Sequence, residues 1–269
     1  MPHSTIKPSR RHALLLAASA ALLAGGKTAF GQSRPAAAPR VAAASDLKFA
    51  LDEIIAAFRR ETGLEIIPVY GSSGNFRRQI SQGAPFEMFM SADEDFVFQL
   101  ADEGLTRDRG SLYGIGRIVL LAPHASPLAV DEGLQGLKAA LVDGRIRRFA
   151  IANPEHAPYG RAAEEALRHA GLWEAIRNRL VLGENVSQAA QFALSGSTEG
   201  GIVALSLVKA PQLAQAGRHA LIAADWHRPL VQRMVLLKQA GEAATLFHAY
   251  LQGPSARVIL ERYGFSLPG

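Results

Sequence analysis

The sequence predicts an α/β protein. Apolar, strand-like runs alternate with amphipathic helical stretches from Val41 to the C-terminus. The chain has 269 residues, of which 48% are hydrophobic and 20% charged, enough for the core of one large domain or two ordinary ones. We find no heptads, internal repeat or low-complexity tract after residue 40. Strand–helix alternation of this kind favours parallel sheets covered by helices.

Each predicted element follows from local patterning. Residues 41–45 form an apolar strand, and the helix after it carries one apolar face from Leu47 to Phe58 and ends at Gly63, a residue suited to a C-terminal cap. Further strands are expected at 64–70, 86–91, 116–123, 147–154, 179–183, 201–205 and 231–237. Further helices are expected at 75–83, 93–104, 160–171, 186–196 and, split at Gly253-Pro254, 242–263.

The N-terminus has the pattern of a cleaved export signal. Arg10 and Arg11 precede a twelve-residue apolar run, 13–24, and small residues continue to Gly31. We therefore predict a signal peptide over residues 1–31 and a disordered lead-in over 32–40. The apolar run is too short to span a membrane comfortably. The arginine pair fits the twin-arginine route, and an ordinary secretory signal remains the alternative.

Removal of this segment changes the charge of the protein. The whole chain has 29 basic and 24 acidic residues, and four of the basic residues lie in the signal, which leaves 25 against 24. A nearly neutral mature chain gives no electrostatic case for binding nucleic acid. The chain contains no cysteine, which excludes disulfides, thiolate chemistry and cysteine-based metal sites.

Four strand ends are each followed by small or polar residues that begin a helix. These helix starts are Ser45-Asp46, 72–75 (SSGN), 158–160 (PYG) and 184–187 (ENVS). The first N–H groups of a helix are unpaired and carry partial positive charge, so they bind anions readily. Ligands of open α/β sheets lie at the carboxyl ends of strands. The pattern predicts a small-anion site, although ordinary helix capping accounts for any single start.

Enzyme and metal readings have weaker support. Residues 71–75 (GSSGN) approach the G-x-S-x-G pattern of a serine nucleophile but end in Asn, and the spacing of the histidines implies no triad. A hydrolase using Ser73 remains an alternative. No P-loop or dinucleotide fingerprint is present. Glu165 and His169 have a spacing that permits metal binding, and an exposed acid–histidine pair is the preferred interpretation.

Several stretches together resemble the periplasmic molybdate-binding proteins of ABC importers, over nearly the full length from 41 to 268. The most specific are 83–94 (GAPFEMFMSADE), 153–160 (NPEHAPYG) and 184–186 (ENV). The resemblance implies a type II periplasmic-binding fold in which two α/β lobes hold an oxyanion in the cleft between them. Its lobes are expected at 41–118 plus 226–269 and at 119–225.

The resemblance also implies the ligand set. Ser45 and Ser73 contribute hydroxyls and amides, and Tyr159 and Val186 contribute backbone N–H groups. Asp46 is included through its own N–H, with its carboxylate turned away as a helix cap because it would repel a dianion. Many relatives have a tyrosine in the "GIVY" strand that reaches the anion. Here that position is Ala204, as in a subgroup that lacks the tyrosine, and the smaller side chain is expected to leave room.

The expected function is binding without catalysis. The resemblance implies a periplasmic, monomeric protein that captures molybdate and tungstate, without a cofactor or nucleic acid, and delivers the oxyanion to an ABC importer permease. Three alternatives stay open. The first is a solute-binding protein of the same fold that takes sulfate, phosphate or a small carboxylate. The second is an exported serine hydrolase that uses Ser73, and the third is a sensor or adhesion protein on the same scaffold with no transport partner.

Overall fold

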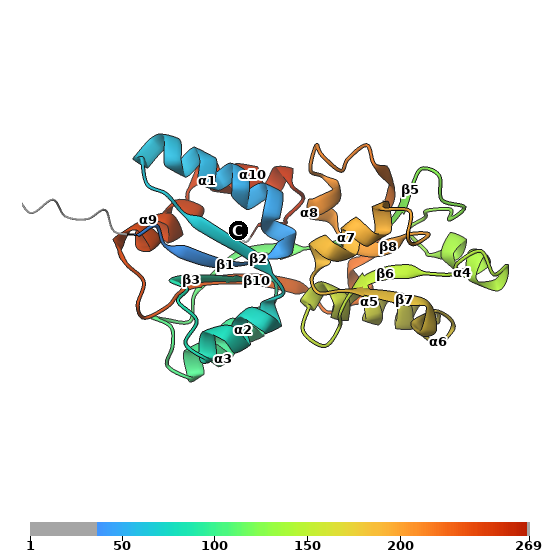
Figure 1. Ribbon diagram of the computed structural model, residues 1–269, viewed down its shortest axis with the longest axis horizontal. Coiled ribbons are helices and arrows are strands. Elements are labelled where there is room, and N and C mark those ends of the chain that lie inside the picture. Colours follow the sequence, from blue (N-terminus) through green and yellow to red (C-terminus); the bar gives the residue numbers. More distant parts are fainter. Residues whose placement is uncertain (1–36, 268–269) are drawn as a thin grey trace, which may run out of the picture. The chain divides into compact units, whose positions relative to one another are not determined.

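The computed structural model describes residues 37–267, which contain two mixed five-stranded sheets with helices on their faces (Figure 1). The predicted signal peptide lies outside the described residues, as does most of the predicted lead-in. Arg40 already belongs to the first strand, and the Pro39 carbonyl accepts a hydrogen bond from the Ile67 N–H at 2.9 Å. Within 37–267, no helix combines the length and apolarity needed to cross a bilayer.

The first sheet has the strand order β2-β1-β3-β10-β4. Strand β1 is parallel to β2 and β3, whereas β10 is antiparallel to β3 and β4. Their bounds are β1 (Arg40–Ala44), β2 (Ile67–Gly71), β3 (Met88–Ser91), β4 (Ser111–Gly116) and β10 (Leu230–Leu236). Successive side chains of a strand point to opposite faces of the sheet, so each face needs its own covering layer.

Helices cover each face of the first sheet (Figure 1). On one face, Val41 and Ala43 pack with residues of α1 (Lys48–Thr62), α9 (Glu242–Leu251) and α10 (Pro254–Arg262). On the other face, Ala42 packs with residues of α2 (Ser73–Ser81) and α3 (Glu94–Asp102). The alternation along β1 therefore places the carboxyl end of this strand between two helical layers.

The second sheet has the order β7-β6-β8-β5-β9, with β6 parallel to β7 and β8, and β5 antiparallel to β8 and β9. Its strands are β5 (Ile118–Pro123), β6 (Phe149–Ala152), β7 (Leu180–Gly183), β8 (Gly201–Ala204) and β9 (Gly217–Leu221). Its helices are α4 (Gln135–Val142), α5 (Pro158–His169), α6 (Trp173–Ile176), α7 (Val186–Leu194) and α8 (Leu205–Val208). Short 3-10 turns are η1 (Ser45–Leu47), η2 (Arg177–Arg179) and η3 (Ala224–Trp226).

The prediction of parallel sheets is wrong, because both sheets are mixed. The antiparallel strands adjoin the two places where the chain passes between sheets. Arg117 alone separates β4 from β5, and the chain returns to the first sheet through the segment between β9 and β10. The strands next to these crossings are antiparallel to their neighbours. The local alternation of strands and helices in the sequence does not reveal this strand direction.

The sequence prediction also missed β4, β9 and α4, together with the short helices α6 and α8. Strand β4 contains two glycines, and β9 (GRHAL) is a largely polar edge strand, so both have weak apolar patterns. Helix α4 follows Leu134, whose φ of 56° lies in the left-handed region that is uncommon for a residue other than glycine. None of these elements contributes a predicted site residue.

The C-terminal helices are fixed to the first sheet by an aromatic cluster. The ring of Phe58 on α1 packs edge-on against Phe247 at 5.1 Å and against Tyr250 at 5.3 Å, both on α9. Phe58 is 1% exposed. The final helices therefore belong to the core and are not a free partner-binding pair.

We expect Phe58→Ala to lower the free energy of unfolding by about 3–5 kcal/mol, because it leaves a cavity where three rings meet. Urea denaturation of the ligand-free protein measures this change. Val258→Ala on α10 is the matched control, because Val258 is 62% exposed and its loss should cost less than about 0.5 kcal/mol. Equal effects of the two substitutions would contradict this account of the core.

Candidate functional site

All five predicted site residues line one small cavity between the carboxyl ends of the strands. It has about 180 Å³ of atom-free space, part of it open to solvent. The lining residues come from both sheets: Ala44, Ser45, Asp46, Gly71, Ser72, Ser73, Ala92, Ala157, Pro158, Tyr159 and Val186. Asp46 is the one ionisable carboxyl in this set, and no Lys or Arg lines the cavity.

The starts of α2 and α7 each leave their first N–H group without an acceptor among the described residues. In α2 the second N–H, of Gly74, donates to the His156 carbonyl at 3.0 Å. In α7 the second N–H, of Ser187, donates to the Ser45 hydroxyl at 3.2 Å. The first N–H groups, of Ser73 and Val186, have no hydrogen-bond acceptor within residues 37–267, although both residues are at most 3% exposed.

Helix α5 repeats this arrangement one residue later. It begins at Pro158, which has no N–H, so the first N–H of the helix belongs to Tyr159. This group also has no acceptor in the described part of the chain, and Tyr159 is 3% exposed. A buried N–H without a partner costs about 1–3 kcal/mol. Ser73, Tyr159 and Val186, the residues that carry these three groups, all line the same cavity.

Two serine hydroxyls complete the neutral donor set. The Ser73 hydroxyl accepts a hydrogen bond from the Ala92 N–H at 3.0 Å, and the Ser45 hydroxyl accepts from Ser187 as described above. Because each oxygen is already an acceptor, its own proton is free to be donated. Ser45 and Ser73 are at most 2% exposed, so their hydroxyls are held close to the cavity.

The Asp46 side chain lies in a buried network that joins the two sheets. Its Oδ2 accepts hydrogen bonds from the Tyr159 hydroxyl at 2.9 Å and from Gln232 Nε2 at 2.8 Å. Its backbone carbonyl accepts from the Ser206 hydroxyl at 2.7 Å. The side chains of the N-cap residues of η1 and α1 make no cap hydrogen bond, so the cap role expected of the Asp46 carboxylate stays a prediction. The same carboxylate also bonds to α5 and β10, which the local pattern did not predict.

Comparison with known proteins agrees with this geometry. The family model of bacterial extracellular solute-binding proteins matches residues 39–266. The chain belongs to this family. The molybdate-binding protein ModA of Azotobacter vinelandii is 36% identical over 235 residues, covering 86% of this chain and 91% of that protein. ModA of Rhodobacter capsulatus is also 36% identical, over 240 residues, covering 87% and 91%.

A solved structure extends the comparison to the fold. The periplasmic molybdate-binding protein of Azotobacter vinelandii superposes with a TM-score of 0.78 and 31% identity, covering 86% of this chain and all of that structure. The predicted two-lobed α/β fold and the predicted family resemblance are thereby confirmed. These relatives bear the names of binding proteins, in agreement with the prediction that the solute-binding protein is not an enzyme.

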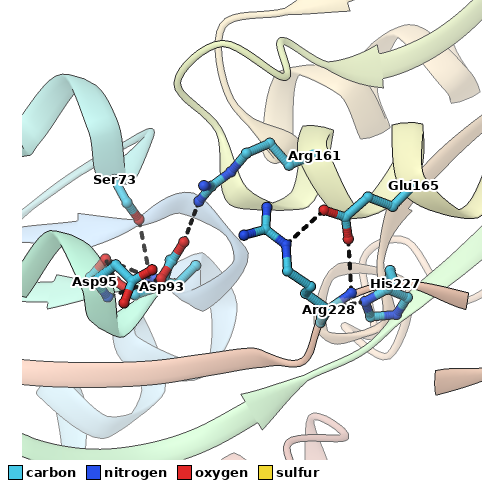
Figure 2. Close-up of polar contacts among 9 residues, drawn as sticks. Ser73, Asp93, Asp95, Arg161, Glu165, His227 and Arg228 are labelled. Atoms are coloured by element: carbon cyan, nitrogen blue, oxygen red, sulfur yellow. Dashed lines mark hydrogen bonds and ion pairs between the residues drawn. The ribbon is translucent and has the colours of Figure 1, made fainter. Parts of the chain in front are cut away.

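A larger, charged hollow adjoins the cavity of the solute-binding protein and shares Pro158 with it. Figure 2 shows that its charged groups pair with one another. Arg161 on α5 forms an ion pair with Asp93, and Arg228 bonds Glu165 with its guanidinium at 2.9 Å and its backbone N–H at 2.8 Å. Because both arginines already have carboxylate partners, the smaller cavity with its unpartnered N–H groups is the better candidate for an oxyanion site.

The structure gives little support to catalysis or to a metal site. Ser73, the suggested nucleophile, bonds the Ala92 N–H, and its neighbour Ser72 bonds a histidine instead. Ser72 and His156 do align with Glu184, but Nε2 lies 3.5 Å from the carboxylate and the serine is 4% exposed. Glu165 pairs with Arg228, and His169 stacks on Trp226. No cluster of three metal-ligating side chains occurs within 37–267.

Three residues outside the predicted ligand set belong to this region, and only Ser72 lies in a predicted helix start, 72–75. Ser72 lines the cavity, Gln232 bonds Asp46, and His156 packs on the start of α2. Gln232 lies within the apolar strand β10. A buried amide requires hydrogen-bond partners, so this position in the sequence could have indicated a buried polar contact. Ala204 is fully buried but is not a lining residue, so the room expected from its small side chain does not open into the cavity.

Burial raises the pKa of the Asp46 carboxyl from its usual 3.8 to about 6, although hydrogen bonds from Gln232 and Tyr159 act in the opposite direction. A raised folded-state pKa means that this group stabilises the fold below pH 3.8 and that this contribution is lost as the pH rises through 6. The free energy of unfolding lost over this pH range through Asp46 is about 3 kcal/mol.

We therefore expect Asp46→Asn, which is neutral at every pH, to gain stability relative to the wild type between about pH 4 and 7. Urea denaturation of both ligand-free proteins across this range measures the difference. We expect the stability advantage of Asp46→Asn over the wild type to increase with pH, by up to about 3 kcal/mol. A difference that stays constant over the range would contradict it.

Proposed function

We propose that this solute-binding protein captures molybdate, and also tungstate, in the periplasm and delivers it to an ABC importer. The observation that carries the proposal is the set of three buried N–H groups without acceptors among the described residues, at Ser73, Tyr159 and Val186, which line one cavity. The hydroxyls of Ser45 and Ser73 add two further donors. The names of the relatives supply the identity of the anion.

The binding chemistry uses dipoles in place of charged side chains. A tetrahedral dianion offers acceptors in several directions, and helix N-termini supply partial positive charge toward it. Asp46 contributes its backbone N–H to this set, while its carboxylate remains bonded to Tyr159 and Gln232. Donors fixed in a rigid cavity discriminate by size, because a site fitted to a larger oxyanion cannot contract fully around sulfate.

Capture is proposed to involve closure of two lobes. The first lobe comprises 41–118 plus 226–269, and the second comprises 119–225. The hydrogen bonds that join the two proposed lobes lie around the cavity, and this supports a ligand site between the lobes. Ser45 contacts Ser187, and Asp46 contacts Tyr159, in each case across the two sheets. The protein is proposed to act as a monomer and to be exported, with the twin-arginine route as one candidate for its export.

Sulfate or phosphate is the alternative ligand. The Asp46 carboxylate lines the cavity, and its Oδ1 has no hydrogen-bond donor among the described residues. A buried acceptor of this kind suits a protonated oxyanion such as hydrogen phosphate, which has a proton to donate. Molybdate is preferred because the relatives that match most of the chain are named for it.

Thermal unfolding with four anions separates these ligands. At about a thousand times its dissociation constant, a ligand adds roughly 4 kcal/mol of stability, which raises the Tm by roughly 10 °C for a chain of this size. We expect such a shift with molybdate and tungstate and little shift with sulfate or phosphate. A clear shift with sulfate or phosphate alone would overturn the assignment.

Ser73→Ala tests the hydroxyl donor. We expect oxyanion affinity to fall about 10- to 100-fold, because a hydrogen bond to a charged ligand is lost, while the protein stays folded. Isothermal titration calorimetry with molybdate measures the loss. Ser81→Ala is the matched control, because it lies at the other end of α2 and bonds Glu103 at the surface. If Ser73→Ala binds as tightly as the control, Ser73 does not donate to the anion.

A further inference from the structure

The segment that contains His156 contacts the start of α2 at two points, and Glu184 adds a third contact. His156 lies between β6 and α5, on the second lobe, and is 8% exposed. Its backbone carbonyl accepts from the Gly74 N–H at 3.0 Å, and its Nδ1 shares a hydrogen bond with the Ser72 hydroxyl at 2.9 Å. Close by, the Asn75 amide donates to the carboxylate of Glu184, at the start of α7.

These contacts hold the helix start that carries Ser73. Ser72 is the N-cap residue of α2, and Ser73 and Gly74 are its first two residues. His156 occupies the Gly74 N–H and orients the Ser72 side chain. The first N–H of this helix start, that of Ser73, keeps no protein acceptor among the described residues, and Ser73 lines the cavity.

Gly74 permits this approach because it has no side chain. A Cβ at position 74 would lie 2.7 Å from the His156 carbonyl oxygen, 3.1 Å from its Cα and 3.2 Å from its Cβ. The first of these distances is closer than real Cβ atoms approach, and two of the three atoms belong to the backbone of the other lobe. A methyl group here therefore opposes the contact between lobes. It does not oppose α2 itself, because alanine favours a helix more than glycine does.

We propose that His156 is a positioning residue for oxyanion binding and that Gly74, which lacks a side chain, allows the His156 backbone to reach the start of α2. This inference rests on the proposed function, because the two residues act by holding the lobes around the anion. His156 acts through Ser72 and Gly74 and does not itself line the cavity. Neither residue was a predicted member of the ligand set.

Gly74→Ala separates this role from folding. We expect molybdate affinity to fall roughly 10- to 100-fold through faster dissociation, while the ligand-free protein still folds cooperatively, with its Tm lowered by only a few degrees through the lost contact between lobes. Stopped-flow kinetics and thermal unfolding measure the two effects. Gly133→Ala is the control, because its Cβ would make only ordinary contacts, at 3.5 Å or more. Unchanged dissociation in Gly74→Ala, or an equal change in the control, would overturn the proposal.

Substitution of His156 tests the side-chain contact. We expect His156→Ala to speed dissociation roughly 3- to 10-fold, the effect of one hydrogen bond, and His156→Asn to restore part of the loss because its amide can bond Ser72. His124→Ala on the surface serves as the control. Identical rates for His156→Ala and the wild type would remove the positioning role from the side chain.

A distance measurement tests the proposal independently of the ligand. The chain has no cysteine, so paired spin labels can be placed without background at Gln79→Cys on α2 and Gln191→Cys on α7, both exposed. We expect Gly74→Ala to lengthen the distances between the labels, with and without molybdate. Unchanged distances would overturn the proposal. If the wild type binds neither molybdate nor tungstate but Gly74→Ala still lengthens the distances, the proposed function fails and the contact between lobes stands.

Discussion

The site depends on a constraint that every helix carries: its first N–H groups have no acceptor within the helix. At the surface, water satisfies them. Here three helix starts are buried together, and the protein partners the second N–H in α2 and α7 while leaving the first N–H groups of all three facing one cavity. The polarity of the site is therefore a property of backbone placement, and side chains mainly adjust it.

Much of this arrangement can be predicted from sequence. Each helix start combines a strand end with small or polar residues, and the same local signals that place a cap also place a free N–H. For this reason the local pattern alone points to the helix starts that contain Ser45, Ser73, Tyr159 and Val186, and all four residues line the cavity. Short-range chemistry decides where a helix begins, and a few consecutive residues carry that information.

The contacts between the lobes could not be predicted in this way. The network of Asp46, Tyr159 and Gln232 joins residues separated by 73 to 186 positions, and His156 meets Ser72 across 84 positions. Strand direction was misjudged for a related reason. Crossings such as the one at Arg117 depend on how two sheets share the chain, and no local pattern records this. Asp46 shows the same limit, because its local pattern predicts a helix cap but does not predict the buried tyrosine and the buried amide that its carboxylate contacts.

The absence of Lys and Arg from the cavity lining has a consequence for the medium in which the protein works. Dissolved salt weakens attraction between exposed charges over distances of about 10 Å, but it screens enclosed groups much less. A ligand held by short hydrogen bonds from buried amides and hydroxyls should keep nearly the same affinity in dilute and in concentrated salt. Ionic strength then affects mainly how fast the anion arrives, and has little influence on how firmly it is held.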